Sequence, residues 1–84
     1  MLSAERIRRV RWRARRGLLE NDIVLTRYLD AHEQDMTDEQ ITALDLLLEL
    51  SDPELLDLIL QRADPTGPLD SPPVHHLIEA LRRV

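Results

Sequence analysis

The chain has 84 residues and a formal net charge of −5, with 16 acidic residues, no cysteine, no lysine and two glycines, Gly17 and Gly67. A chain of this length has room for one domain with a modest core, because it buries only about 60–65% of its unfolded surface. Disulfide scaffolds and cysteine zinc sites are excluded, and so are glycine-rich dinucleotide and Walker-type phosphate loops.

The net charge conceals an uneven distribution. All 11 basic residues are arginines, and seven of them lie in the first 16 residues, which carry +6 once Glu5 is subtracted. The remaining 68 residues hold four arginines and 15 acidic side chains, or −11. The sequence therefore joins a short basic arm to an acidic body, and we expect residues 1–84 to form one helical domain.

Two helices are predicted in the first part of the chain. Seventeen leucines and few β-branched residues favour helices throughout. Ser3 is the expected N-cap of a basic first helix, residues 4–16, and Gly17 is expected to stop it in a left-handed conformation. Its predicted apolar stripe consists of Ile7, Val10 and Ala14. A second helix over residues 18–31 is expected to bury Leu18, Leu19, Ile23, Leu25, Tyr28 and Leu29.

Three further helices follow from cap signals. Thr37 and Gln40 form a predicted capping box, so a third helix begins at Asp38. Asp52-Pro53 marks a fourth helix running to about Arg62. Residues 63–73 hold four prolines and are expected to be an irregular linker before a final helix over residues 74–83. The predicted core residues are Ile41, Leu44, Leu47, Leu48, Leu55, Leu56, Ile59, Leu60, Val74, Leu77, Ile78 and Leu81. The fold class is therefore an all-α bundle of about five short helices.

No catalytic or metal-binding constellation stands out. His32 lacks the second histidine of a zincin motif, and adjacent His75 and His76 point about 100° apart on a helix. The serines lie at expected helix caps, and most carboxylates lie in first turns, where the helix dipole favours them. We therefore expect no enzyme activity and no metal in this chain.

Trp12 is surrounded by arginines on the side of the predicted first helix opposite its apolar stripe. Tryptophan and arginine are enriched at the energetic centres of protein interfaces, and arginine can stack on an indole ring. Trp12 and Arg15 are therefore candidate partner-binding residues. The alternative is that Trp12 packs beneath a neighbouring helix, with arginine stems covering it.

Arg16, Gly17 and Glu20 also have an ordinary structural explanation, since arginine ends helices, glycine follows them and glutamate begins them. However, the string from Arg15 to Glu20 resembles the Arg-Gly-x-x-Glu signature of the SdhE-type succinate dehydrogenase assembly factors, or flavinylation factors. The family's helix order fits residues 5–84, with Asp52-Pro53-Glu54-Leu55 at the start of the fourth helix. Asn21 departs from the pattern, because members often carry an apolar residue there.

The resemblance implies a chaperone that binds the flavoprotein subunit of succinate dehydrogenase and promotes covalent attachment of FAD to it. Fumarate reductase flavoprotein is a second implied client. Arg16, Gly17 and Glu20 would contact the client, joined by Trp12 and Arg15. FAD would be attached to the client, and no FAD is expected to bind tightly to this chain itself.

Two alternative functions stay open from the sequence. The seven arginines of the basic arm could neutralise nucleic-acid phosphates, although the acidic body would repel a polyanion and Trp12 is a single stacking residue. The second alternative comes from the resemblance: this chain could neutralise a toxin, a role proposed for some members of the family. We favour the assembly factor and expect no nucleic-acid partner. No apolar run approaches the roughly 18 residues that cross a bilayer, so no membrane insertion is expected, and the expected location is the bacterial cytoplasm.

Overall fold

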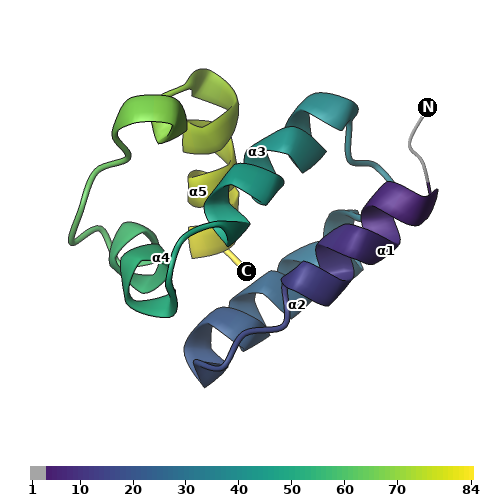
Figure 1. Cartoon of the computed structure of the whole chain (residues 1–84), viewed down its shortest axis with the longest axis horizontal. Coiled ribbons are helices and arrows are strands. Elements are labelled where there is room, and N and C mark those ends of the chain that lie inside the picture. The colour runs from purple at the N-terminus through teal and green to yellow at the C-terminus, as the bar shows by residue number, and fades with distance from the viewer. Residues whose placement is uncertain (1–3) are drawn as a thin grey trace.

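The computed structural model describes residues 4–84. Within them lie five α-helices and one short 3-10 helix, with no strand (Figure 1). The elements are α1 (Ala4–Arg13), α2 (Leu19–His32), α3 (Asp38–Leu48), α4 (Asp52–Ile59), η1 (Gly67–Leu69) and α5 (Pro72–Arg82). The predicted all-α bundle of five short helices is confirmed. The predicted N-cap, Ser3, lies outside the described residues.

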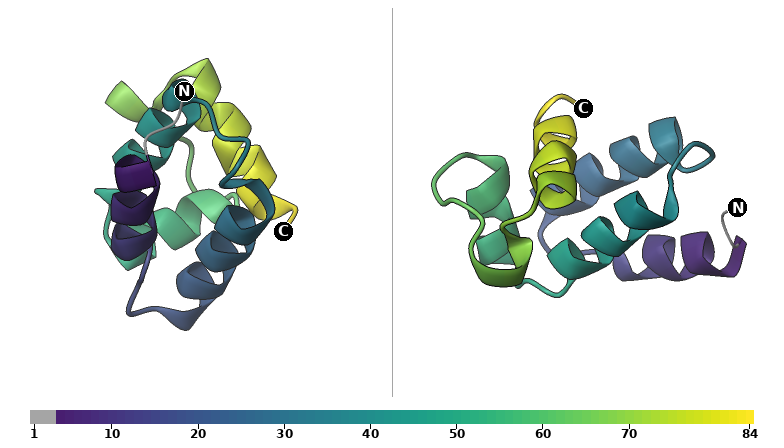
Figure 2. Two further views of the ribbon diagram at one scale, coloured as in Figure 1. Left: turned by 90° about the vertical axis from the view of Figure 1, so that its right-hand side faces the viewer. Right: turned by 90° about the horizontal axis from the view of Figure 1, so that it is seen from above.

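Helix α3 occupies the middle of the bundle. It packs against α5 on one side and α1 on the other, and α5 also contacts α2 and α4. Two further views show α1 lying beside α3 at the margin of the bundle (Figure 2). The molecule measures 34 × 26 × 21 Å. None of the helices between residues 4 and 84 is long and apolar enough to cross a membrane.

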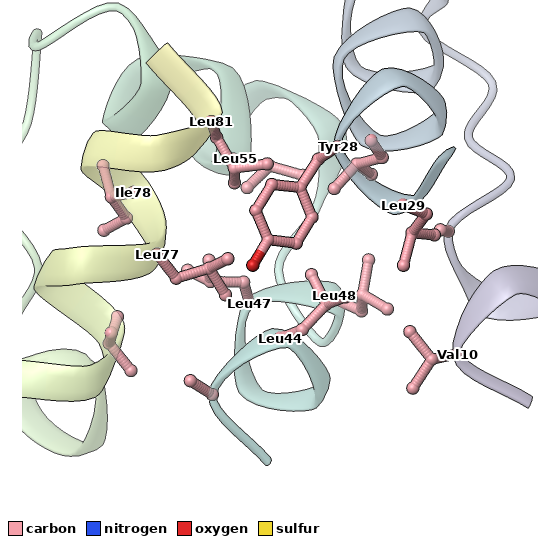
Figure 3. Packing of buried hydrophobic residues seen from close by; sticks show 14 of the residues in the cluster. Val10, Tyr28, Leu29, Leu44, Leu47, Leu48, Leu55, Leu77, Ile78 and Leu81 are labelled. Carbon is pink, nitrogen blue, oxygen red and sulfur yellow. The ribbon is translucent and has the colours of Figure 1, made fainter. Parts of the chain in front are cut away.

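Leucines make up half of the buried core, and several of them surround the Tyr28 ring (Figure 3). Burial raises the pKa of the Tyr28 hydroxyl. The apolar stripe of α1 is confirmed, because Val10 and Ala14 are buried and Ile7 packs against the core. Also confirmed as buried are Leu25, Leu29, Ile41, Leu44, Leu47, Leu48, Leu55, Ile59, Val74, Leu77, Ile78 and Leu81.

Of the remaining predicted core residues, Leu18 and Leu56 are only half-buried, and three others are exposed. Leu19 is 63% exposed, Ile23 39% and Leu60 48%. Helix α2 buries only the side that carries Leu25 and Tyr28. Because each helical residue turns about 100°, Leu19 lies about 180° from Tyr28 and faces outward. The prediction for Leu19 and Ile23 was wrong because it placed apolar residues from too wide an arc of α2 in the core.

The predicted end of the first helix at residue 16 is also wrong. Helix α1 ends at Arg13, and the Arg15 amide donates to the Trp12 carbonyl in a closing turn. The expected left-handed stop at Gly17 is wrong as well, since the only positive φ angles among residues 4–84 are those of Gln61 and Gly67. Beyond the end of the helix, the Arg16 side chain reaches Asp52 of α4.

The capping box of α3 is confirmed, with the Thr37 side chain accepting from the Gln40 amide. At α4 the N-cap is Ser51, which forms a second capping box with Glu54, and Asp52 is the first helical residue rather than the cap.

Helix α4 ends at Ile59, earlier than predicted. Gln61 adopts a φ of 63°, and the Arg62 amide then donates to the Asp57 carbonyl over 2.8 Å. This left-handed residue stops the helix in the way a glycine usually does. The predicted irregular linker, residues 63–73, contains η1, and α5 starts inside it at Pro72, because proline is well suited to the first turn of a helix.

Candidate partner-binding site

The seven arginines of the basic arm fall into two sets. Four of them, which we call the inner arginines, pair with carboxylates of other helices. The pairs are Arg6 with Asp38 at 3.2 Å, Arg11 with Asp30 at 2.6 Å and Glu33 at 2.5 Å, Arg13 with Asp45 at 2.7 Å, and Arg16 with Asp52 at 2.7 Å. Hydrogen bonding to Glu33 raises the pKa of Arg11 further. The inner arginines thus join α1 and the segment after it to α2, α3 and α4.

The other three, which we call the outer arginines, are Arg8, Arg9 and Arg15. Each is exposed, and none of them forms an ion pair within residues 4–84. Positions 8, 9 and 12 of a helix fall within an arc of about 100°, so Arg8 and Arg9 share a side of α1 with Trp12. The charge of this side of the helix is therefore left for solvent or a partner.

Arg16 is the most buried of the paired arginines, with 12% of its side chain exposed. Besides the Asp52 bond through Nε, its Nη1 donates to the Leu48 carbonyl over 3.1 Å and its Nη2 donates to the Leu50 carbonyl. These carbonyls belong to the end of α3 and the turn that follows it. Arg16 therefore fastens the segment between α1 and α2 to the junction of α3 and α4.

Asp52 is the acceptor at the centre of this junction. Its Oδ1 accepts from Arg16 Nε and from Asn21 Nδ2, while its Oδ2 accepts from the Leu18 amide over 3.1 Å. The Leu18 amide precedes α2, which has no side-chain N-cap. The hydrogen bond from Arg16, assisted by those from Asn21 and Leu18, holds the pKa of the Asp52 carboxyl below its ordinary value.

Asn21 is fully buried, and its Nδ2 also donates to the Asp52 carbonyl over 2.9 Å. A buried amide is costly unless it finds a partner, and Asp52 supplies two acceptors. The departure of Asn21 from the family pattern thus gains a structural reason: this residue connects the first turn of α2 to the first turn of α4. Its Oδ1 is buried without a hydrogen-bond partner in the described structure.

Gly17 is exposed at the turn held by this junction. A Cβ placed on it would lie 3.7 Å from Asp52 Oδ2, which is ordinary van der Waals contact. Its backbone has no positive φ. The fold therefore accepts a small side chain at position 17, and any need for glycine there comes from outside the fold.

Trp12 is 72% exposed, which answers the alternative that it packs beneath a helix. The Arg15 guanidinium lies over the indole, with Cζ 5.6 Å from the ring centroid. Trp12 stands at a groove of about 410 Å³ between α1 and α2. The groove is lined by Arg8, Arg11, Trp12, Ala14, Arg15, Thr26 and Leu29.

Glu20 is exposed in the first turn of α2 and forms no hydrogen bond or ion pair with the described residues. Leu19 and Ile23 lie on the same side of α2 as Thr26, because positions 19, 23 and 26 fall within about 60° of one another. We call Trp12, Arg15, Gly17, Leu19 and Glu20 the corner face. Four of these residues were candidates from the sequence; Arg16, the fifth candidate, is left out because its side chain is mostly buried.

Asp52, Asn21 and Leu19 are the residues of this site that the sequence analysis did not recognise. Asn21 carried a usable signal, because it lies in helical register with Leu25 and Tyr28 and a buried amide needs a partner. Asp52 could not be identified as that partner from the sequence, because an aspartate directly before Pro53 is already explained as the start of a helix.

His32 and His76 line the same cavity, but the histidines of the described residues do not form a metal-binding group. The His75 ring bonds to Asp70 at 2.8 Å, and the His32 ring lies 4.7 Å from that of Tyr28. In the described part of the chain, no group of three or more histidine, aspartate or glutamate side chains is placed to hold a metal ion.

Comparison with known proteins identifies the family of this chain. A family model described as "Flavinator of succinate dehydrogenase" matches residues 8–84. The chain belongs to this family. It is 50% identical over 76 residues to the FAD assembly factor SdhE of Ralstonia nicotianae, covering 90% of this chain and 80% of that protein.

More distant relatives agree. The FAD assembly factor SdhE of Acetobacter pasteurianus is 34% identical over 80 residues, covering 94% of this chain and 73% of the relative. That of Aliivibrio fischeri is 38% identical over 60 residues, covering 71% and 70%. No solved structure matches the chain significantly. The family resemblance inferred from Arg16, Gly17 and Glu20 is thereby confirmed, and the main functional expectation, a flavinylation factor, is the one these matches support. The nucleic-acid and toxin alternatives receive no support from them.

Proposed function

We propose that this chain binds the flavoprotein subunit of succinate dehydrogenase through the corner face and promotes covalent attachment of FAD to that subunit. The observation that carries the site assignment is the exposure of Trp12, stacked by Arg15 at the groove beside the corner. A large indole left in water is costly in a free chain and is typical of the centre of an interface.

Arg16 supports this surface from within. Three of its N–H groups already donate to Asp52, Leu48 and Leu50, and little of its side chain is exposed. We therefore assign Arg16 a positioning role in place of the direct client contact expected from the resemblance. It fixes the turn that presents Gly17 and the first turn of α2 that presents Glu20.

Gly17 and Glu20 are proposed to meet the client. The absence of a side chain at position 17 allows a client backbone to approach the turn closely. Glu20 has a free carboxylate that can accept hydrogen bonds from client amides or guanidinium groups. Leu19, exposed between them, adds apolar area to the contact.

The chain is proposed to act as a chaperone rather than an enzyme, with the covalent chemistry performed by FAD and the client. Holding the client's flavin and its acceptor side chain in reactive geometry can contribute several kcal/mol, and a clamp on the client supplies it without any catalytic group in this chain. FAD is the group attached to the client. We also propose fumarate reductase flavoprotein as a second client and the bacterial cytoplasm as the location, in keeping with the bacterial relatives.

The test uses the purified flavoprotein subunit prepared without covalent flavin. It is incubated with FAD in the presence and absence of this chain, and covalent flavin is measured by in-gel fluorescence after denaturation. We expect the chain to co-elute with the subunit and to increase covalent flavin. No complex and no increase would contradict the proposal. The same assay with the fumarate reductase flavoprotein tests the second client.

A further inference from the structure

The division of the arginines leaves a cationic surface on one side of α1. The inner arginines are neutralised by carboxylates of α2, α3 and α4, whereas the outer arginines have no carboxylate partner among residues 4–84. The outer arginines and the exposed Trp12 therefore form one continuous side of α1 and its end. The carboxylates of Asp30 in α2 and of Glu33 directly after it are already occupied by Arg11.

The groove beside this surface has apolar side chains within it. Ala14 and Leu29 are buried core residues that contribute to its lining, and Trp12 contributes its indole. Arg8 and Arg15 line the same groove. A groove of about 410 Å³ with an apolar lining and arginine guanidinium groups around it suits an apolar side chain with carboxylates close to it in sequence.

We propose that the groove between α1 and α2 binds an acidic segment of the flavoprotein client, with its carboxylates on the outer arginines and an apolar side chain beside Trp12. This inference rests on the proposed function and names the chemistry of the client surface. Arginine is suited to the task because its planar guanidinium group can bind a carboxylate through two hydrogen bonds.

Two other occupants fit less well. A second copy of the chain would bring another −5 of net charge, so that long-range repulsion opposes a dimer. A nucleic acid would meet the −11 of residues 17–84, and Trp12 is the only tryptophan on which its bases could stack. An acidic segment on a folded protein places its charge locally and avoids most of this repulsion.

The experiment compares two charge-reversed variants by binding kinetics on the immobilised flavoprotein subunit. The first is Arg8→Glu/Arg9→Glu. The matched control is Arg62→Glu/Arg83→Glu, whose positions are exposed and lie outside α1 and α2. Each pair changes the formal charge from −5 to −9, so a general effect of net charge is common to both. Circular dichroism melting confirms that each variant is folded.

We expect Arg8→Glu/Arg9→Glu to lower the association rate at about 50 mM salt by about tenfold or more, and the control by less than about threefold. The wild-type rate should fall steeply towards about 500 mM salt, and the rate of the first variant should fall much less. Equal rates for the two variants, with a wild-type chain that binds and flavinylates normally, would overturn this inference alone. A wild-type chain that fails to bind the subunit would overturn it together with the proposed function.

Two further results would also count against it. One is a wild-type dimer that Arg8→Glu/Arg9→Glu disperses without changing binding to the subunit. The other is loss of binding to a fluorescent single-stranded oligonucleotide in that variant while binding to the subunit is unchanged. Light scattering and fluorescence anisotropy on the same protein samples measure both.

Discussion

The two sides of α1 use the same residue type for different purposes. On the inner side, Arg6, Arg11 and Arg13 connect the helix to carboxylates of α2 and α3. Arg16, just after the helix, reaches the Asp52 carboxylate of α4 and two backbone carbonyls. On the outer side, the arginines and Trp12 contact water. The comparison teaches that the arginines of this segment divide into a set that holds the fold together and an exposed set that we propose binds the client, and that only the fold separates the two sets.

The same separation applies to the string from Arg16 to Glu20 at the corner. Arg16 belongs to the inner side, because its donors are used within the molecule, whereas Gly17 and Glu20 belong to the outer side. Substitutions on the inner side should therefore change stability first. Substitutions on the outer side should change partner binding and leave stability nearly unchanged.

The largest stability effect is expected from Arg16→Ala. Removing the guanidinium group leaves the Leu48 and Leu50 carbonyls and the Asp52 carboxylate without their donor, which should lower the free energy of unfolding by about 2–3 kcal/mol. Arg15→Ala is the matched outer control and should change it by less than about 0.5 kcal/mol. Urea unfolding of both variants gives the two values, and equal values would remove the distinction between the sides.

The outer side is tested by Trp12→Ala. The indole is largely exposed, so the free energy of unfolding should change by less than about 0.5 kcal/mol. Affinity for the flavoprotein subunit should fall about 30-fold or more, since a central tryptophan contributes about 2 kcal/mol or more to an interface. Calorimetric titration measures the affinity. Leu60→Ala, another exposed apolar residue at the end of α4, is the control and should bind as the wild type does.

A pH experiment sharpens the role of Asp52. Its pKa is lowered in the folded chain, chiefly by the hydrogen bond from Arg16. The ionised carboxylate therefore stabilises the fold fully when the pH is above 3.8, the ordinary pKa of this group. Asp52→Asn should be less stable than the wild type by about 1–2 kcal/mol at neutral pH. The difference should persist to about pH 5 and shrink as the pH falls below about 4, because the carboxyl is then protonated first in the unfolded chain and, at still lower pH, in the folded chain as well. Unfolding curves across this range check it, and a difference independent of pH would contradict the assignment.

The smallest effect is expected far from both sides. Gln61 has a φ of 63°, which glycine adopts without the steric cost of a Cβ, so Gln61→Gly should stabilise the chain by about 0.5–1 kcal/mol. Binding to the flavoprotein subunit should not change. Thermal unfolding measures the stability, and calorimetric titration with the flavoprotein subunit measures the affinity. A change in affinity would show that stability and binding are coupled in this molecule.

The elements of the fold were largely predictable, because caps and apolar spacing are local signals. Thr37 with Gln40 gave the start of α3 correctly. Helix ends were less predictable: α1 ends at Arg13, before Gly17, and the left-handed residue after α4 is Gln61, where glycine is usual.

The site was predictable only in part. Trp12 and Arg15 could be named as interface candidates from residue type, and their exposure in the structure fits that role. The pairing of Arg16 with Asp52 could not be predicted, because the two residues are separated by 36 positions in the chain and each has an ordinary local explanation. Leu19 was placed in the core because apolar residues are usually buried, and only the packing of α2 shows that this one faces outward.

The central claim is that the corner face contacts the client while the inner side holds the fold, and Gly17 tests it most directly. A Cβ at this position has room within the fold, and a longer side chain on this exposed turn would project into the proposed contact. Covalent flavin in the flavoprotein subunit is measured by in-gel fluorescence with equal amounts of folded wild type, Gly17→Ala and Gly17→Leu. We predict that Gly17→Leu melts within a few degrees of the wild type and gives at most about a tenth of its covalent flavin, with Gly17→Ala between them. Full flavinylation by folded Gly17→Leu would contradict the account.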